Sequence, residues 1–221
     1  FSFDGDTLPH IETVDTLQLV PANKASVLIQ ASTTPGTYYL RRLVFSDDVP
    51  FENPVPEIVL ARIVVQGEPV AMDLPQGALP RPAVLNDIAD EEITGYRTLV
   101  FDVQDGVPGG YGPDQTGFLV DQQLFDAARV DQLVTLGSVE EWTVVNATGA
   151  QHPFHIHQGP FQVVAVNGVP MEPRWADTWP LPGNGTLTIR QRFDRFDGRY
   201  VLHCHMLPHE DMGMMQVVEV V

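Results

Sequence analysis

Residues 199–220 read RYVLHCHMLPHEDMGMMQVVEV, two short apolar runs separated by a polar stretch with a proline and a glycine. The runs are rich in valine and other residues that favour strands. The same pattern recurs along the chain with turn residues between the runs, and only residues 121–128 permit a turn of helix. Short strands at this spacing predict an all-β sandwich or barrel. We expect strands at 26–31, 37–44, 57–66, 96–103, 141–146, 161–166, 186–191, 199–203 and 215–220.

Composition narrows the possible partners. Of 221 residues, 43% are hydrophobic and 19% are charged, which is ordinary for a folded protein. There are 29 acidic and 12 basic residues, a formal net charge of −17, and such a surface repels a phosphate backbone. We therefore expect no nucleic-acid partner. We also expect no membrane span, because no run approaches the roughly 20 uncharged apolar residues that a spanning helix needs.

A change of composition divides the chain. Residues 67–82 (GEPVAMDLPQGALPRP) are rich in proline and glycine and lack strand alternation, which predicts a linker. Residues 1–66 contain few predicted strands for a closed sandwich, so we interpret them as part of a domain. Residues 83–221 are long enough for a complete β domain.

Six of the seven histidines fall into two motifs, HPFHIH at 152–157 and HCHMLPH at 203–209, and the second motif contains the only cysteine. Imidazole is the commonest metal ligand in proteins. The alternative interpretation, ordinary core or surface histidines, does not explain this clustering. We expect His10, the one histidine outside the motifs, to have no metal role.

The second motif continues a predicted strand. Because side chains alternate across a strand, His203 and His205 should point to one side and Cys204 to the other. Cys204 is followed by His209 at +5 and Met214 at +10. A thiolate, two imidazoles and a weak axial thioether form a blue-copper electron-transfer site. The spacing predicts such a site, with its second imidazole supplied from elsewhere in the chain.

The first motif contains a candidate for that second imidazole. His155 and His157 are two residues apart and share a strand face, whereas His152 is set off from them by Pro153. Four imidazoles are then left without a role in a single-copper site: His155, His157, His203 and His205. Imidazole suits copper, zinc, iron and nickel. A structural zinc site is the alternative for these four, but such sites usually include cysteines at C-x-x-C spacing, which this sequence lacks.

These motifs resemble the C-terminal copper signature of multicopper oxidases, the family of laccases, bilirubin oxidases and metal oxidases. The resemblance extends through LGSVEEWTVVN (136–146), WADTWPLP (175–182) and RFDGRYVLHCH (195–205), and it covers essentially all of residues 83–221. The ending HEDMGMM is most similar to the bacterial spore-coat laccase and bilirubin oxidase branch. The stretch from LVPANKASVLIQ to PGTYYL (19–40) resembles late strands of the family's middle domain. The implied fold is a cupredoxin-like Greek-key sandwich or barrel, one complete domain preceded by part of a second.

The resemblance implies copper as the cofactor and assigns its ligands. A complete type 1 site is implied at His152, Cys204, His209 and the axial Met214. The type 2 ligand is His155, and the type 3 ligands are His157, His203 and His205.

The resemblance also implies the course of the reaction. A small reducing molecule gives single electrons to type 1 copper near the exposed edge of His152 or His209. The electrons pass through Cys204 to the neighbouring histidines, and dioxygen is reduced to water. Glu210 matches an acid for which proton delivery is proposed in related enzymes. The alternatives for Glu210 are a solvated carboxylate or a hydrogen bond to an imidazole.

The sequence departs from the family in one respect. The family's trinuclear site takes eight histidines, four of them from an N-terminal domain, and before residue 152 this chain has only His10. It therefore carries half of the type 2 and type 3 sites. We expect a C-terminal portion of a longer, extracytoplasmic oxidase that is inactive toward dioxygen alone. The missing cupredoxin domain would belong to the same gene product or to a second chain.

Three other functions compete with a phenol-oxidising laccase. A cuprous-ion oxidase would use the nearby Met206, Met212 and Met215, but the sequence has no methionine-rich insert. A stand-alone blue-copper module would need only the type 1 ligands and would leave the histidines beside Cys204 without a purpose. Copper nitrite reductases lack a histidine directly after the cysteine, so His205 argues against them.

Overall fold

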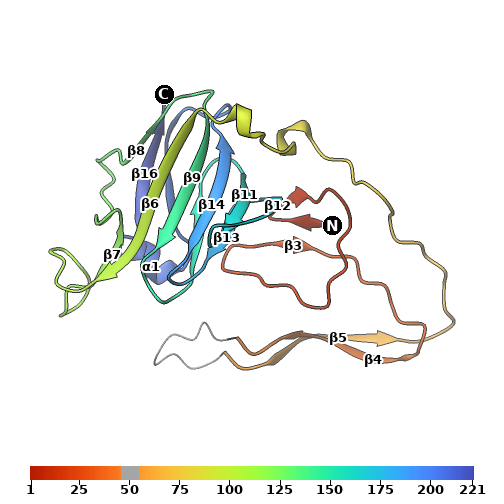
Figure 1. Ribbon diagram of the computed structural model, residues 1–221. Helices are drawn as coiled ribbons and strands as arrows, with labels where there is room; N and C mark the ends of the chain where they lie inside the picture. Colours follow the sequence, from red (N-terminus) through yellow and green to blue (C-terminus); the bar gives the residue numbers. More distant parts are fainter. Residues whose placement is uncertain (46–54) are drawn as a thin grey trace.

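The computed structural model describes residues 1–45 and 55–221 (Figure 1). Residues 46–54, which fall inside the predicted partial domain, lie outside the described part of the chain. Two large sheets pack face to face and contain the histidine motifs, and two smaller sheets precede them along the chain.

The larger sheet has six strands in the order β12-β11-β14-β9-β6-β7. Its β6 and β9 run parallel, and the other neighbours run antiparallel. Buried and half-buried residues alternate strictly along β9 and β14, as expected for strands with one face on a core. The six strands are β6 (Gly95–Gln104), β7 (Gly117–Val120), β9 (Val139–Asn146), β11 (Phe161–Val166), β12 (Val169–Ala176) and β14 (Thr186–Arg192).

The second sheet has five strands in the order β13-β10-β15-β16-β8. Its central pair, β10 and β15, is antiparallel and pairs His155 with His203 and Phe154 with Cys204. The two histidine motifs therefore lie side by side, although about 50 residues separate them in sequence. The five strands are β8 (Gln132–Val134), β10 (His152–Ile156), β13 (Thr178–Leu181), β15 (Gly198–Cys204) and β16 (Met215–Val220).

A core of large apolar side chains lies between the two sheets. Phe154 of β10 packs against Phe101 and Phe161 of the opposite sheet, with ring centroids 5.9 and 5.7 Å apart. All three rings are fully buried. Burying such a side chain contributes roughly 1.5–3 kcal/mol. This packing holds β10, and with it the first histidine motif, in a fixed position.

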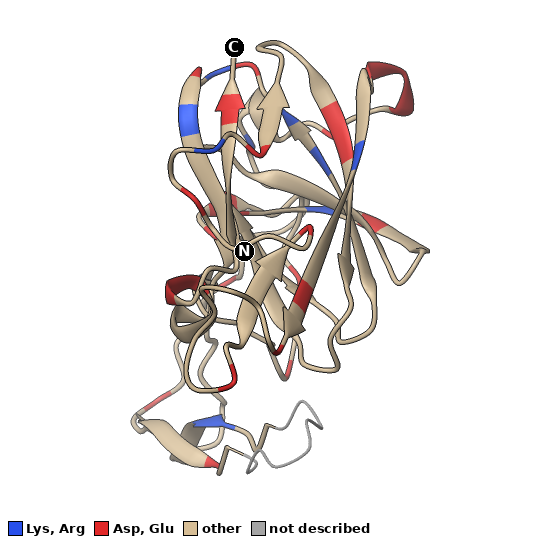
Figure 2. Cartoon of the chain, turned by 90° about the vertical axis from the view of Figure 1, so that its left-hand side faces the viewer, with Lys and Arg blue, Asp and Glu red and all other residues tan. Residues whose placement is uncertain are grey.

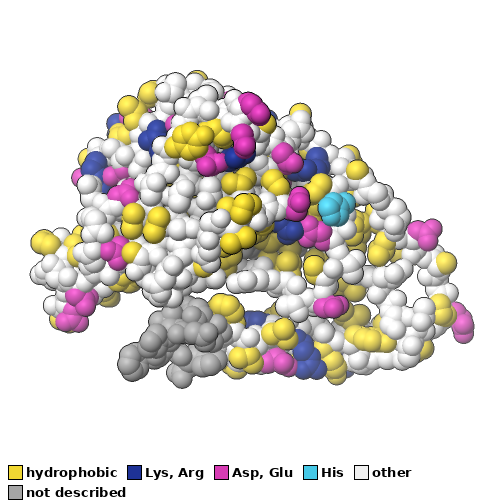
Figure 3. Space-filling view, viewed as in Figure 1, with side chains coloured by type: hydrophobic (Ala, Val, Ile, Leu, Met, Phe, Trp, Pro, Cys, Tyr) yellow, Lys and Arg dark blue, Asp and Glu magenta, His cyan; other side chains and the backbone are white. Residues whose placement is uncertain are grey.

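The first part of the chain contributes Phe3 to this core, with Leu8 and Ala25 packed against it, but its long hairpin stays outside. The hairpin of β4 (Gly36–Arg42) and β5 (Ile58–Val65) is exposed along almost its whole length. It lies apart from the sandwich in Figure 1, and Figure 3 shows hydrophobic side chains along it. The remaining short elements are β1 (Ser2–Phe3), β2 (Asp6–Thr7), β3 (Ala25–Ser26) and the 3-10 turns Ala83–Leu85 and Asp90–Glu92.

The all-β prediction is confirmed, and several details differ from it. Residues 121–128 form no helix, because Asp121 and Gln122 adopt positive φ angles of 53° and 64° in a tight turn after β7. The one α-helix in the described residues is α1 (Leu207–Asp211), which the sequence reasoning missed. Of the strand expected at 26–31, only its first residue is in a strand. The eight-residue strand β12 and the shorter strands β1, β2, β7, β8, β10 and β13 were not predicted.

The distribution of acidic residues and the length of the helices concern the expected absence of nucleic-acid and membrane partners. Aspartate and glutamate are spread over strands and loops of the face shown in Figure 2 and do not form one patch. No helix of the described residues has the length and apolar character needed to cross a membrane.

Candidate metal centre

Three potential metal-binding atoms converge where β15 ends. Cys204 Sγ lies 3.5 Å from His152 Nδ1 and 3.6 Å from His209 Nδ1, and the two nitrogens are 3.1 Å apart. Ligands about 2.0–2.3 Å from one shared ion would lie roughly 3.5–4 Å from each other in a trigonal arrangement. The triangle is therefore near the size that a single ion requires. A thiolate with two imidazoles suits copper.

A short helix returns the chain to this triangle. Pro208 occupies the first turn of α1, where its missing N–H has no intrahelical partner to lose. The N–H of Met214 donates to the carbonyl of His209 at 3.0 Å, and the N–H of Cys204 donates to the carbonyl of Met214 at 3.1 Å. These backbone bonds close the loop and place His209 beside Cys204. The Met214 side chain is fully buried.

Burial sets the protonation of the triangle without a metal. It lowers the pKa of His152 to about 4, helped by the neighbouring His209, and it lowers the pKa of His209 as well. It raises the pKa of the Cys204 thiol to about 12. Near neutral pH the metal-free site therefore holds two neutral imidazoles and a protonated thiol. A bound cation supplies the charge that favours the thiolate, so metal binding should release a proton.

On the other side of β15, four imidazoles gather. Nitrogens of His155, His157 and His203 lie within 4.8 Å of one another, and His157 Nε2 is 3.3 Å from His203 Nε2. The ring of His205 lies beside them, 5.2 Å from the rings of both His155 and His203. The predicted alternation is present, since His203 faces this group and Cys204 faces the other.

Hydrogen bonds orient His155 within its group. Its Nδ1 lies 2.7 Å from the Asp177 carbonyl and 3.0 Å from Thr178 Oγ1, whose own hydroxyl donates to the Asp177 carboxylate at 2.9 Å. Both partners of Nδ1 act as acceptors, so Nδ1 carries the proton and Nε2 keeps its lone pair. Burial lowers the pKa of His155 to about 4, which keeps the ring neutral and able to bind a metal.

Glu210 contacts the same group from α1. Its Oε2 lies 3.2 Å from Nδ1 of His203. Burial lowers the pKa of His203, and the Glu210 charge opposes that shift. The hydrogen bond of His203 Nδ1 is to the Cys204 carbonyl at 3.1 Å, so Glu210 places its carboxylate beside an imidazole that another acceptor already orients. The neighbouring Asp211 is exposed.

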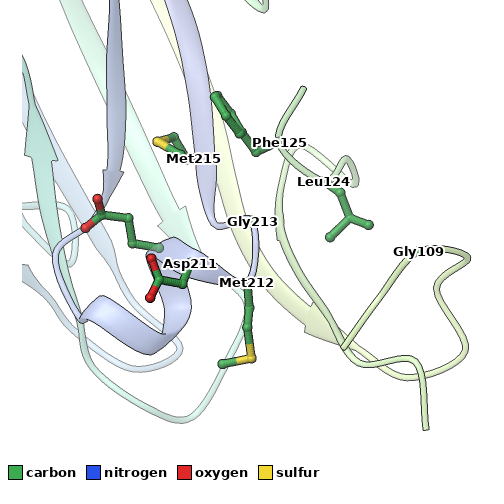
Figure 4. Close-up of a pocket in the computed structure, with 8 residues that line it drawn as sticks. Gly109, Leu124, Phe125, Asp211, Met212, Gly213 and Met215 are labelled. Carbon is green, nitrogen blue, oxygen red and sulfur yellow. The ribbon is translucent and has the colours of Figure 1, made fainter. Parts of the chain in front are cut away.

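A surface cavity of about 380 Å³ lies beside the His209 helix. Asp211 and Met212 border it from the α1 side, and Leu124 and Phe125 border it from the segment after β7 (Figure 4). The remaining lining residues are Gly109, Glu210, Gly213 and Met215.

The structure also identifies neighbours that the sequence did not indicate. The ring of Phe118 lies 4.7 Å from that of His209, and Thr148 Oγ1 lies 2.8 Å from His152 Nε2. Neither belongs to a recognisable ligand spacing. Exposure also separates the two imidazoles of the triangle: His152 is 1% exposed, whereas His209 is half-buried. His209 therefore offers the more accessible edge.

The metal-free protein should lose stability in mild acid. An unfolded histidine binds a proton near pH 6.5, whereas folded His152 resists protonation until about pH 4. Between these values the unfolded state binds more protons, so stability falls with pH, by about 3 kcal/mol over the whole interval for His152. Urea unfolding of the metal-free protein near pH 7.5 and pH 5 measures the loss.

Two variants isolate the contribution of His152 to this loss. His152→Asn should reduce the pH dependence, and Thr143→Val, which removes no titratable group, should leave it unchanged. Asp6 acts in the opposite direction, because burial raises its pKa to about 6 and protonation there favours the folded state. If His152→Asn has the same pH dependence as the unsubstituted chain, the explanation from His152 burial is wrong.

Comparison with known proteins adds a family match. A sequence profile described as "Multicopper oxidase" matches residues 93–221, which is more than half of the chain. A laccase of Bacillus subtilis is 26% identical over 240 aligned residues, which cover 98% of this chain and 45% of the laccase. A laccase of Bacillus stratosphericus is 31% identical over 163 residues, covering 64% of this chain and 30% of that protein.

A solved structure shows the same architecture. A multicopper oxidase from Campylobacter jejuni, described as a metallo-oxidase, superposes with a TM-score of 0.69 at 26% identity. The match covers 84% of this chain and 41% of that protein. This chain thus spans less than half the length of each of these three proteins.

Proposed function

The chain belongs to the multicopper oxidase family, whose members are copper-dependent oxidoreductases, and on that basis we propose that it provides the electron-accepting copper site of such an oxidase together with half of its dioxygen-reducing site. The observation that carries this proposal is the triangle of Cys204 Sγ with Nδ1 of His152 and His209, at 3.5 and 3.6 Å. We assign these three residues, with Met214 as axial ligand, to type 1 copper. In the second group, His155 is the type 2 ligand, and the type 3 ligands are His157, His203 and His205.

Copper held at these sites would supply the one-electron chemistry that a four-electron reduction of dioxygen to water requires. The chain's own residues support this in three ways. Cys204 and His203 are adjacent in β15 and face different groups, so one peptide links the two sites. His209 presents the more accessible imidazole edge. Glu210, which contacts His203 Nδ1, can hold a proton beside the second group.

We propose an organic, phenol-type reductant, because the cavity beside α1 includes apolar walls from Leu124 and Phe125. A cuprous-ion substrate is the second candidate, favoured by one observation. Met212 and Met215 line the same cavity together with the carboxylates of Glu210 and Asp211, and thioethers are ligands that select Cu(I).

We further propose residues 1–66 as part of a middle cupredoxin domain, 67–82 as the linker and 83–221 as the C-terminal domain. The exposed apolar hairpin of β4 and β5 supports the first assignment, because so small a unit buries little on its own. The second histidine group is completed by a further cupredoxin domain, in the same gene product or in a second chain. On this proposal, the 221-residue chain alone binds fewer than the four copper ions that dioxygen reduction needs.

Copper loading tests this proposal. After addition of copper and removal of the excess, the 221-residue chain should bind about one tightly held copper, absorb intensely in the visible range and consume no dioxygen. Metal analysis, a visible spectrum and an oxygen electrode measure the three quantities on one sample. Anaerobic addition of a phenol or of a cuprous salt then identifies which reductant bleaches the band. A colourless protein with bound copper would contradict the type 1 assignment.

A further inference from the structure

The Nε2 nitrogen of His152, the ring nitrogen that does not belong to the triangle, contacts a hydroxyl group. Thr148, in the loop between β9 and β10, places Oγ1 2.8 Å from His152 Nε2. Which of the two atoms donates decides the tautomer of the imidazole, and the tautomer decides which nitrogen is free to bind a metal. The surroundings of Thr148 settle the direction of this hydrogen bond.

Asn146 fixes the hydroxyl proton of Thr148. The side-chain amide of Asn146 donates one hydrogen to the Ala150 carbonyl at 2.7 Å and the other to the Pro182 carbonyl at 3.0 Å. Its oxygen therefore points the other way, where it accepts the Thr148 N–H at 2.9 Å and lies 2.8 Å from Thr148 Oγ1. Asn146 is 2% exposed, so water does not compete for these bonds.

The hydroxyl of Thr148 thus has only acceptors for its proton. Besides the Asn146 oxygen, the other partner within reach is the Ala150 carbonyl at 3.2 Å. If the proton pointed at His152 instead, Oγ1 would face the Asn146 oxygen at 2.8 Å with no hydrogen between them, which is repulsive, so the proton goes to an oxygen and Oγ1 meets His152 through a lone pair. Nε2 of His152 must then carry the ring proton. The lone pair of the ring lies on Nδ1, the nitrogen 3.5 Å from Cys204 Sγ.

We propose that Thr148, oriented by Asn146, is a positioning residue that holds His152 in the tautomer with its Nδ1 lone pair directed at the type 1 site. This inference rests on the proposed function for the metal it serves, but the hydrogen-bond chain exists without a metal. His209 differs in this respect, because the described hydrogen bonds give its Nε2 no protein partner. The hydrogen-bond chain therefore fixes the Nε2 side of the buried imidazole, whereas the contacts of the His209 ring are with His152, Cys204 and Phe118.

Thr148→Val removes the acceptor with little change in side-chain size. Nε2–H of His152 is then buried without a partner, so the ring loses its preference for that tautomer. Removing the hydrogen-bond partner of a metal-ligating histidine typically costs 10–100-fold in metal affinity. We expect at least about a tenfold loss in Cu(II) affinity. The lost hydrogen bond also makes the ring a weaker donor, which disfavours Cu(II) more than Cu(I), and a tenfold difference between the two corresponds to a rise of about 59 mV in the reduction potential.

Two readouts test the role of Thr148. Two-bond proton–nitrogen NMR of the metal-free protein reports the tautomer, and it should show Nε2–H for His152 in the unsubstituted chain and a loss of that preference in Thr148→Val. Potentiometry of the copper-loaded protein should show the raised potential in Thr148→Val. Thr148→Ser retains the hydroxyl and should restore both signals. Thr143→Val, at a half-buried position of β9, is the matched control and should change neither.

The NMR readout decides the inference whether or not copper binds. An Nδ1–H tautomer for His152 in the unsubstituted chain, or an unchanged tautomer in Thr148→Val, would overturn it. Absence of a blue band in the unsubstituted copper-loaded protein would instead overturn the proposed type 1 site. In that case the tautomer comparison still decides whether Thr148 orients His152.

Discussion

Replacing Cys204 with serine is expected to abolish the intense visible absorption of the copper-loaded protein. The band depends on electron transfer between the thiolate sulfur and copper, and a serine oxygen is a harder and weaker donor at this position. His152 and His209 remain, so some copper can still bind, but without the colour. The substitution changes one atom of a fully buried side chain, so the fold should survive.

Matched spectra of the copper-loaded variants check this result. His10→Ala is the control, because His10 is exposed and belongs to neither group of potential metal ligands. It should keep the full band. Thermal unfolding of metal-free Cys204→Ser should show a folded protein, which separates loss of the ligand from loss of structure. An unchanged visible spectrum in Cys204→Ser would remove the basis for the type 1 assignment.

Replacing Glu210 with glutamine is expected to slow dioxygen consumption by about 10²-fold, the lower end of what general acid–base groups contribute. The measurement needs a preparation that reduces dioxygen, meaning this chain with the histidines that complete its second group. Reduction of the blue copper should change far less than dioxygen consumption, because glutamine keeps the size and polarity of Glu210 in the cavity lining, whereas the contact with His203 loses its acid. Stopped-flow measurements of the two half-reactions separate these effects.

Glutamine is informative because it separates two roles of Glu210. The glutamine side chain can still lie against His203, whose Nδ1 is hydrogen-bonded to the Cys204 carbonyl, but it cannot carry a proton at neutral pH. If Glu210 only orients His203, Glu210→Gln should therefore keep nearly full activity. Asp211→Asn is the matched control, since it removes one negative charge from the next residue of α1. Equal slowing in both variants would indicate a general charge effect and contradict proton delivery by Glu210.

The sequence predicted those features of the site that depend on local periodicity. The opposite directions of His203 and Cys204, and the shared direction of His203 and His205, could be predicted from an extended backbone alone. Successive side chains of any strand point to opposite faces. The spacing from Cys204 to His209 is likewise local, running from the last residue of β15 into α1. The all-β architecture followed from many short runs with turn residues between them, and an error in any single run did not change that conclusion.

Elements stabilised by their neighbours were harder to predict. β10 contains a proline and two histidines, which gives it no clear strand pattern, yet it is a central strand because β13 and β15 pair with it on either side. α1 is too short to show a helical period, and backbone bonds around Met214 hold it in place.

The sequence by itself determined which residue types are available for metal binding and how they alternate along each strand. The tertiary structure decided which of them meet: His152 reaches Cys204 across 52 residues because β10 pairs with β15 and Phe154 anchors it in the core. It also decided that His209 is the accessible imidazole and that Thr148 fixes the tautomer of His152. The physical reason is that alternation is a property of one strand, whereas strand pairing and burial depend on how the whole chain packs.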